Sequence, residues 1–322
     1  MPYTIQSSIS LEHQVTKNLT ATATYINSRG EHQFFSQNLA SIGQSTANNY
    51  QYVSEGFFRQ NQLIVQGSYR GPMGTSLFGF YVFGHANADT SGSGSFPTQP
   101  GNLPADYGRA GFDVHQKLFL GGNMALPWGI SFAPFLIANS GAPFNITLGE
   151  DLNGDNIYND RPAFCSASTI TANAVHSIYG CFDKGTTLGE TPIPINHAQG
   201  PATFSFNMRL TKVIGFGPST AKPKASQGAD TSGAPPPPTA GGSSHHHDHG
   251  DFGFGGGSTS TGRKYNLSFG LQALNVFNVV NYTTPVGVLS SPQFGQQTKL
   301  AGGIFSSNTA VRRIQLQTSF SF

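Results

Sequence analysis

Apolar and polar residues alternate along much of this chain. In the segment LTATATYINSRG at 19–30, apolar residues alternate with threonines as far as Tyr25, and RRIQLQTSFSF at 312–322 alternates in the same way from Ile314 onward. A period of two residues is typical of a strand with one face in an apolar medium and the other in a polar one. No window of about 11 residues shows convincing helical periodicity. The pattern therefore predicts an all-β protein.

Nine segments carry this strand signal, and most of them are ten residues or longer: 4–13, 19–30, 58–70, 75–89, 111–125, 130–149, 204–215, 263–278 and 312–322. Strands of soluble proteins average about 5–6 residues. Tilted membrane strands need about 9–11 residues to cross the hydrocarbon. The lengths therefore favour a transmembrane β-barrel over a soluble β-sandwich.

The connections between these segments alternate in length. The tight connections are 14–18, 71–74 and 125–128, and the long ones are 30–57, 89–109, 149–201 and 278–310. Outer-membrane barrels have short periplasmic turns and long extracellular loops, so the alternation also assigns the two sides of the membrane. Bacterial single-chain barrels have an even number of strands. We therefore expect an all-β, antiparallel transmembrane β-barrel portion of about nine long strands, incomplete as a barrel, with long extracellular loops.

One connection breaks the alternation. Residues 215–262 fall where a periplasmic turn is expected, yet they contain GAPPPPTAGGSSHHHDHGDFGFGGGSTSTG. A low-complexity segment of this kind cannot bury enough apolar surface to fold, so it predicts a disordered linker. The expected organisation is barrel strands with extracellular loops in 1–214, the linker in 215–262, and the last barrel strands in 263–322.

Composition excludes several classes of function. Charged residues make up 10% of the chain and the net charge is +2, without a basic stripe, which argues against a nucleic-acid partner. No stretch approaches the roughly 18 consecutive apolar residues of a membrane helix, and MPYTIQSSIS lacks the basic start and apolar run of a secretory signal. No GxSxG, HExxH, CxxC or P-loop motif occurs. We therefore expect that the chain is not an enzyme.

Several segments carry a family likeness when they are taken together. They are YINSRG at 25–30, FFRQNQLIVQGSYR at 57–70, DYGRAGFDVHQKLFLGG at 106–122, PWGISFAPFLIANSGAPFNITLGEDLNGDNIYNDRP at 127–162, RKYNLSFGLQALNVFN at 263–278, and SPQFGQ at 291–296 with the RRIQLQTSFSF ending. These segments resemble the C-terminal barrel half of TonB-dependent outer-membrane receptors. More narrowly, they resemble the large subfamily that carries an N-terminal carboxypeptidase-regulatory-like domain.

This resemblance implies a location in the bacterial cell outer membrane and a part in the active uptake of a bulky, unidentified nutrient. The implied partners are outer-membrane lipid, an extracellular ligand, and the TonB complex, which would act through a plug that this chain lacks. A barrel of the family has about 22 strands, preceded by a signal peptide, a small β-sandwich and the plug. The chain therefore resembles a fragment or a truncated reading frame. The alternative is a structural or adhesive outer-membrane surface protein without transport.

The last predicted strand carries a second likeness. Its apolar face consists of Ile314, Leu316, Phe320 and Phe322, with only Thr318 among them. A terminal Phe on such a face resembles the insertion signal that the barrel assembly machinery reads in bacterial outer-membrane proteins. The alternative is an ordinary amphipathic edge strand.

The segment DLNGDNIYND at 151–160 has the oxygen spacing of a calcium loop. Its candidate ligands are Asp151, Asn153, Asp155, the Ile157 carbonyl, Asn159 and Asp160. Position six holds Asn156 rather than Gly, and position twelve holds Pro162 rather than a bidentate Glu. An Asx-rich turn is therefore the alternative. Calcium is the only cofactor that the sequence suggests.

The predicted linker contains the histidines His245, His246, His247 and His249. Imidazole binds zinc, copper and nickel well. A specific site also needs fixed geometry, which a Gly-, Ser- and Pro-rich segment does not provide. We expect adventitious metal binding at these residues.

Two further groups of residues have open roles. Cys165 and Cys181 lie inside one polar loop, where they form either a local disulfide in an oxidising compartment or two free thiols. Near strand ends and in loops lie the arginines Arg29, Arg59, Arg70, Arg109 and Arg161. For these arginines, strand register and solvation compete with ligand contact.

Overall fold

A single antiparallel sheet dominates the structure, a computed structural model that describes residues 1–40, 47–167, 171–219, 261–302 and 310–322. Its nine long strands are β1 (Tyr3–Thr16), β2 (Leu19–Asn38), β3 (Tyr50–Arg70), β4 (Ser76–Ala88), β6 (Gln116–Leu126), β7 (Ile130–Asn139), β13 (Thr203–Ser219), β14 (Arg263–Leu274) and β15 (Arg313–Ser321). Each pairs with the next in chain order, and the two-residue β5 (Gly108–Arg109) also pairs with β4. The nine strands predicted from the sequence are therefore confirmed, as is the all-β class.

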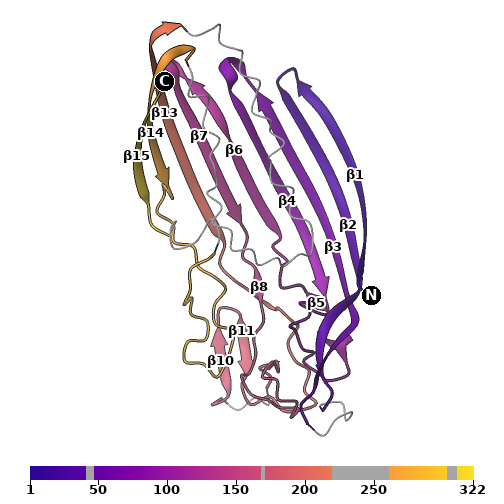
Figure 1. The fold of residues 1–322 in the computed structure, drawn as a ribbon. Coiled ribbons are helices and arrows are strands. Elements are labelled where there is room, and N and C mark those ends of the chain that lie inside the picture. Colours follow the sequence, from indigo (N-terminus) through magenta and orange to yellow (C-terminus); the bar gives the residue numbers. More distant parts are fainter. Residues whose placement is uncertain (41–46, 168–170, 220–260, 303–309) are drawn as a thin grey trace.

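The long strands alternate in direction across a curved sheet, with their tight turns at the top and their long connections at the bottom (Figure 1). Two of the turns contain short 3-10 elements, η1 (Pro72–Gly74) and η3 (Pro127–Gly129). In each, a residue with positive φ (Met73, 55°; Trp128, 61°) precedes a glycine that also has positive φ. Two successive positive φ values match the right-handed twist of the flanking strands, which is why a glycine ends both turns.

The strands β2 and β3 extend further than their sequence pattern predicts. The connection expected at 30–57 shrinks to 39–49, because pairing resumes beyond an irregularity at Gly30–Gln33 and continues to Asn38↔Tyr50. His32 takes a positive φ of 56° at this irregularity. A bulge of this kind shifts the register and hides the continuation of the strand from a period-two search.

Two other predicted strands are shorter at one end. The strand expected at 111–125 begins only at Gln116. Before it, the Ala86 N–H of β4 donates to the Asp113 carboxylate and not to a backbone carbonyl of the predicted strand. The strand expected at 130–149 ends at Asn139, and Phe144, Ile146 and Leu148 after it belong to a separate core. In the opposite sense, β13 continues to Ser219, five residues into the predicted linker.

The two faces of the sheet differ in burial and in composition. On β3, Gln60, Gln62 and Ile64 are buried, while the intervening Leu63 and Val65 are exposed. Paired residues of neighbouring strands share a face, so the exposed set continues across the sheet as Leu63, Val65, Tyr81, Phe83, Leu118 and Leu120. We call this the outer face and the opposite one the inner face. Exposed apolar side chains at every second position are what a strand presents to lipid.

The inner face is less polar than the alternation predicts. The rings of Phe78, Phe80 and Phe135 all lie within 5.5 Å of the Phe119 ring, centroid to centroid. Phe119 pairs with Phe80 on β4 and Ile137 on β7, and its own side chain is buried. The inner face therefore carries an aromatic cluster at the level of the outer-face leucines.

Aromatic rings also gather at the tight-turn end of the outer face. Phe320 lies 6.1 Å from both Phe216 and Tyr265 and 6.0 Å from Phe322. Register places these rings together, because Phe216 pairs with Tyr265 while Phe320 pairs with the nearby Leu267. Aromatic girdles of this kind mark the interfaces of outer-membrane barrels.

The sheet does not close on itself within the part of the chain that the structure describes. No pairing joins β1 to β15 there, so each is an edge. No helix among the described residues is long and apolar enough to cross a membrane. With β1 and β15 as its edges, the described sheet is an incomplete barrel wall.

If the outer face contacts lipid, Leu120→Arg should lower the free energy of unfolding by about 2–4 kcal/mol, since that is the cost of a cation at mid-membrane depth. Urea unfolding in phospholipid vesicles, followed by the fluorescence of the single tryptophan, Trp128, measures the change. The matched control is Gln66→Arg on the inner face, which should have little effect. Equal destabilisation by both substitutions would contradict the assignment of the faces.

Candidate functional site

The long connections at one end of the sheet fold together into a structure that we call the cap, formed by 89–115, 140–202 and 275–302 without 168–170. It contains η2 (Leu103–Asp106), β8 (Pro143–Phe144), β9 (Ala163–Phe164), β10 (Ala174–Ser177), β11 (Gly180–Asp183) and β12 (Ala198–Gln199). Its own hydrophobic core consists of Phe144, Ile146, Leu148, Phe182, Ile193, Ala198 and Leu289. Long connections of outer-membrane barrels are extracellular, so the cap lies at the extracellular end of the sheet.

Two connections that are distant in sequence meet in the cap. The Thr147 N–H donates to the Gly287 carbonyl, and the Leu289 N–H donates to the Thr147 carbonyl, both at hydrogen-bond distance. A β-bridge also joins Thr147 to Val288. Because these bonds hold the β7–β13 connection against the β14–β15 connection, the extracellular end is a packed unit instead of separate loops.

The cysteine pair lies inside this unit. The structure joins Cys165 to Cys181 in a disulfide, with their Cα atoms 5.4 Å apart. The Cys165 N–H also donates to the Cys181 carbonyl, beside the pairing of β9 with β11. Closing a loop of this length stabilises a fold by about 3 kcal/mol when the chain-entropy account holds.

The predicted calcium loop is built as a series of Asx turns. Asp151 Oδ1 accepts from Gly154 N at 2.8 Å and from Asp155 N at 3.1 Å, and its Oδ2 accepts from Asn156 N at 2.8 Å. Asn156 takes a positive φ of 63°, which is the conformation that a Gly at position six would supply. The loop therefore contains the Asx turns that the sequence predicted as the alternative to calcium binding.

The other candidate ligands form hydrogen bonds both within the loop and to the neighbouring segment 96–98. Asn153 Nδ2 donates to the Thr98 carbonyl at 2.9 Å, and Asn159 Nδ2 donates to the Phe96 carbonyl at 3.0 Å. Ile157 N donates to Asp155 Oδ1, and Leu152 N donates to Asp160 Oδ2. Burial raises the pKa of the Asp155 and Asp160 carboxyls, and the nearby Asp151 charge adds to both shifts. Calcium binding at this loop stays a prediction.

Of the five candidate arginines, Arg161 is the most deeply buried. Its Nη2 lies 2.8 Å from Asp106 Oδ1, and both side chains are almost fully inaccessible. Burial lowers the pKa of the Arg161 guanidinium, and the Asp106 carboxylate opposes that shift. Asp106 Oδ2 also accepts from Thr98 N at 2.6 Å. This pair therefore joins the β4–β5 connection to the β7–β13 connection and is not presented to a ligand.

Arg29, Arg59 and Arg109 lie at the outer surface of the sheet. Arg29 forms an ion pair with Glu31, and Arg109 Nε lies 2.9 Å from Asp113 Oδ2. Both the Arg29 and the Arg59 guanidiniums lie over the Phe57 ring, at 5.2 and 5.0 Å from its centroid. A cation–π contact of this kind contributes about 0.5–1 kcal/mol at an exposed site. The two contacts therefore orient Arg29 and Arg59 but leave both guanidiniums accessible.

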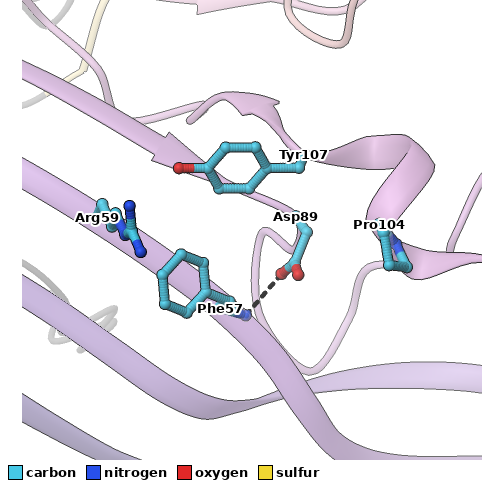
Figure 2. A pocket seen from close by; sticks show the side chains of 5 residues that line it. All are labelled: Phe57, Arg59, Asp89, Pro104 and Tyr107. Carbon is cyan, nitrogen blue, oxygen red and sulfur yellow. Dashed lines mark hydrogen bonds between the residues drawn. The ribbon is translucent and has the colours of Figure 1, made fainter.

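A shallow pocket of about 310 Å³ opens beside Arg59, lined by Phe57, Arg59, Asp89, Pro104 and Tyr107. Figure 2 shows the Tyr107 ring above the Phe57 ring, with Arg59 on one side of them and Asp89 on the other. Asp89 Oδ1 accepts from Phe57 N at 2.6 Å, and burial raises the pKa of its carboxyl. The pocket is therefore lined by one guanidinium, one carboxylate and two aromatic rings in contact with each other, with centroids 5.9 Å apart.

The remaining metal candidates, His245, His246, His247 and His249, lie outside the described residues, as does 220–260 as a whole. The sequence analysis did not single out His85, Asp113 and His115, which the structure brings together at the edge between β4 and β6. No spacing signal pointed to them, since His85 is separated from His115 by a strand end and a loop.

Replacing Arg161 by Met should destabilise the cap by about 3–5 kcal/mol, because the Asp106 carboxylate stays buried without its partner. Hydrogen exchange of the Thr98 amide, which donates to Asp106, reports the opening of the cap. The matched control is Arg59→Met at the exposed pocket rim, which should leave that exchange unchanged. Unaltered protection of Thr98 in the Arg161 variant would contradict a supporting role for the pair.

Comparison with known proteins places the chain in a family. Residues 1–222 match the sequence model of the family described as "Outer membrane beta barrel domain". Among solved structures, the outer membrane transporter YddB from Escherichia coli is similar, at a TM-score of 0.45 and 12% sequence identity. The alignment covers 99% of this chain and 32% of that chain, so this chain spans about a third of its length. None of the curated proteins matches. The chain belongs to the outer membrane beta barrel domain family, and its place is the bacterial outer membrane.

Proposed function

We propose that this chain forms part of the barrel wall of a TonB-dependent receptor that takes up a bulky nutrient across the outer membrane. The observation that carries the proposal is the aromatic cluster of Phe78, Phe80, Phe119 and Phe135 on the inner face. The lumen of an open porin is polar and filled with water. Large outer-membrane transporters have a plugged lumen instead, against which aromatic side chains can pack.

Two further features support the same proposal. The segments that resemble TonB-dependent receptors include β3, β6, β7 and β14, which all belong to the one continuous sheet. The cap gathers the long connections into one folded unit at the end of the sheet, and the proposal assigns ligand contact to it. In this proposal the chain is not an enzyme, its energy comes from the TonB complex through a plug, and the cap contacts the ligand.

A growth experiment in the native bacterium tests this function. The gene for this chain and a gene of the energising complex are deleted separately, and both strains are grown on a panel of large nutrients at limiting concentration. We expect both strains to fail on a shared nutrient, with rescue of the first strain by the restored gene. Normal growth of that strain on every nutrient that needs the energising complex, together with lost surface attachment, would favour the structural or adhesive alternative.

The proposal also names the barrel assembly machinery as a partner, through the face of Ile314, Leu316, Phe320 and Phe322. Replacing Phe322 by Asp should reduce the amount of assembled protein in the outer membrane, because it removes an aromatic residue from this face and from contact with Phe320. The neighbouring Ser321→Asp, on the inner face, is the matched control and should assemble normally. Equal yields from heat-modifiability assays of the two variants would count against this partner.

A further inference from the structure

The edge between β4 and β6 contains a cluster of two histidines and one aspartate. Ladder pairing of these strands ends at Phe83↔Gln116. Beyond that point, Asp113 turns its carboxylate toward β4, where Oδ1 accepts from Ala86 N at 2.8 Å. Its other oxygen, Oδ2, faces two imidazole rings. The His115 Nε2 lies 2.8 Å from Oδ2, and the His85 Nδ1 lies 3.3 Å from it.

The three facing atoms form a nearly regular triangle. Its third side, from His85 Nδ1 to His115 Nε2, is also 3.3 Å. In a tetrahedral zinc site with bonds of about 2.0–2.2 Å, neighbouring ligand atoms lie roughly 3.3 Å apart. The observed triangle is therefore one face of such a tetrahedron, and an ion slightly above its plane reaches all three atoms at ordinary bond lengths.

From this geometry we propose that His85, Asp113 and His115 form a zinc site with an open fourth position. Two imidazole nitrogens and one carboxylate oxygen suit zinc and its first-row neighbours, whereas calcium and magnesium prefer oxygen ligands alone. Three protein ligands leave the fourth position to water. The exposed fractions of the His85 and His115 side chains, 54% and 36%, leave room for that water.

The carboxylate is held in place from behind. Asp113 is 3% exposed, and apart from the Ala86 N–H it receives the Arg109 Nε at 2.9 Å on Oδ2. Arg109 Nη2 also donates to the Asp113 carbonyl at 3.4 Å. A carboxylate oxygen has two lone pairs, so Oδ2 can accept from Arg109 and bind an ion at once. Hydrogen bonds to a ligating carboxylate fix its orientation.

The position of the cluster gives the ion a role in the barrel wall. His85 shares a strand face with Tyr81 and Phe83, so it stands on the outer face at the extracellular end of the apolar band. Asp113 and His115 precede β6, and the His115 carbonyl still accepts from the Gly84 N–H of β4. A bound zinc therefore joins β4 to the segment that lies between its ladder with β6 and its ladder with β5. The site does not depend on the proposed transport function.

Zinc titration of the full chain, folded in detergent micelles, tests the site. His245, His246, His247 and His249 are first replaced by Ser, because these histidines would bind zinc adventitiously. Binding is measured by competition with a chromophoric chelator, and coordination by the visible spectrum of Co²⁺ in the same site. We expect one ion per chain and the intense absorption of tetrahedral Co²⁺.

His85→Gln and His115→Gln should each weaken zinc binding by at least about tenfold and abolish the tetrahedral Co²⁺ spectrum. The matched control, His13→Gln on β1, should bind as tightly as the background chain. Circular dichroism shows whether each variant keeps its β structure, and Asp113 is left intact because its carboxylate also serves Ala86 N. Absence of stoichiometric binding in the folded background chain, or equal binding by all three variants, would show a hydrogen-bonded cluster without an ion and overturn the proposal.

Discussion

Hydrocarbon offers no hydrogen-bond partner to a peptide group, and the rest of this structure follows from that constraint. Every strand that crosses the membrane must find its backbone partners in neighbouring strands. From β1 to β15, each of the seven interior strands pairs with a neighbour on both sides. This pairing meets the requirement along the membrane-spanning part of those strands. Where the β4–β6 ladder ends, the Asp113 carboxylate provides the acceptor for Ala86 N. The same local solution that completes the hydrogen bonding of β4 also places Asp113 beside His85 and His115.

With the backbone hydrogen bonds formed between strands, the side chains of each strand point alternately to the outer face and to the inner face. The outer face carries exposed leucines and aromatic rings, and the inner face carries buried glutamines together with the cluster around Phe119. An inner aromatic cluster is unfavourable in a water-filled lumen. This asymmetry connects the sheet to the proposed function, because a plugged lumen would cover these rings. At the extracellular end, the buried Arg161–Asp106 pair and the Cys165–Cys181 disulfide hold the connections in one arrangement over the sheet.

Sequence reasoning reached the fold because the dominant signal is periodic. Alternation identified every long strand, and the short segments between alternating runs identified the tight connections. It failed where the period is broken. The bulge near His32 hid the parts of β2 and β3 between it and the connection at 39–49. It also read the segment from Phe144 to Leu148 as part of β7, because Phe144, Ile146 and Leu148 alternate with polar residues as in a membrane strand although they pack in a separate core. The triad of His85, Asp113 and His115 was beyond its reach, since the contact is made by register between distant segments.

The central claim, that one side of each strand faces lipid, is tested most directly by fluorescence quenching in bilayers with brominated acyl chains. Two single-tryptophan variants, Val65→Trp and Gln66→Trp, are made in a Trp128→Phe background, and each is inserted into such bilayers. The two positions are adjacent on β3 and both are exposed, so they differ only in the face they occupy. The structure predicts strong quenching at position 65 and weak quenching at position 66. Equal quenching at the two positions, or stronger quenching at position 66, would contradict the account.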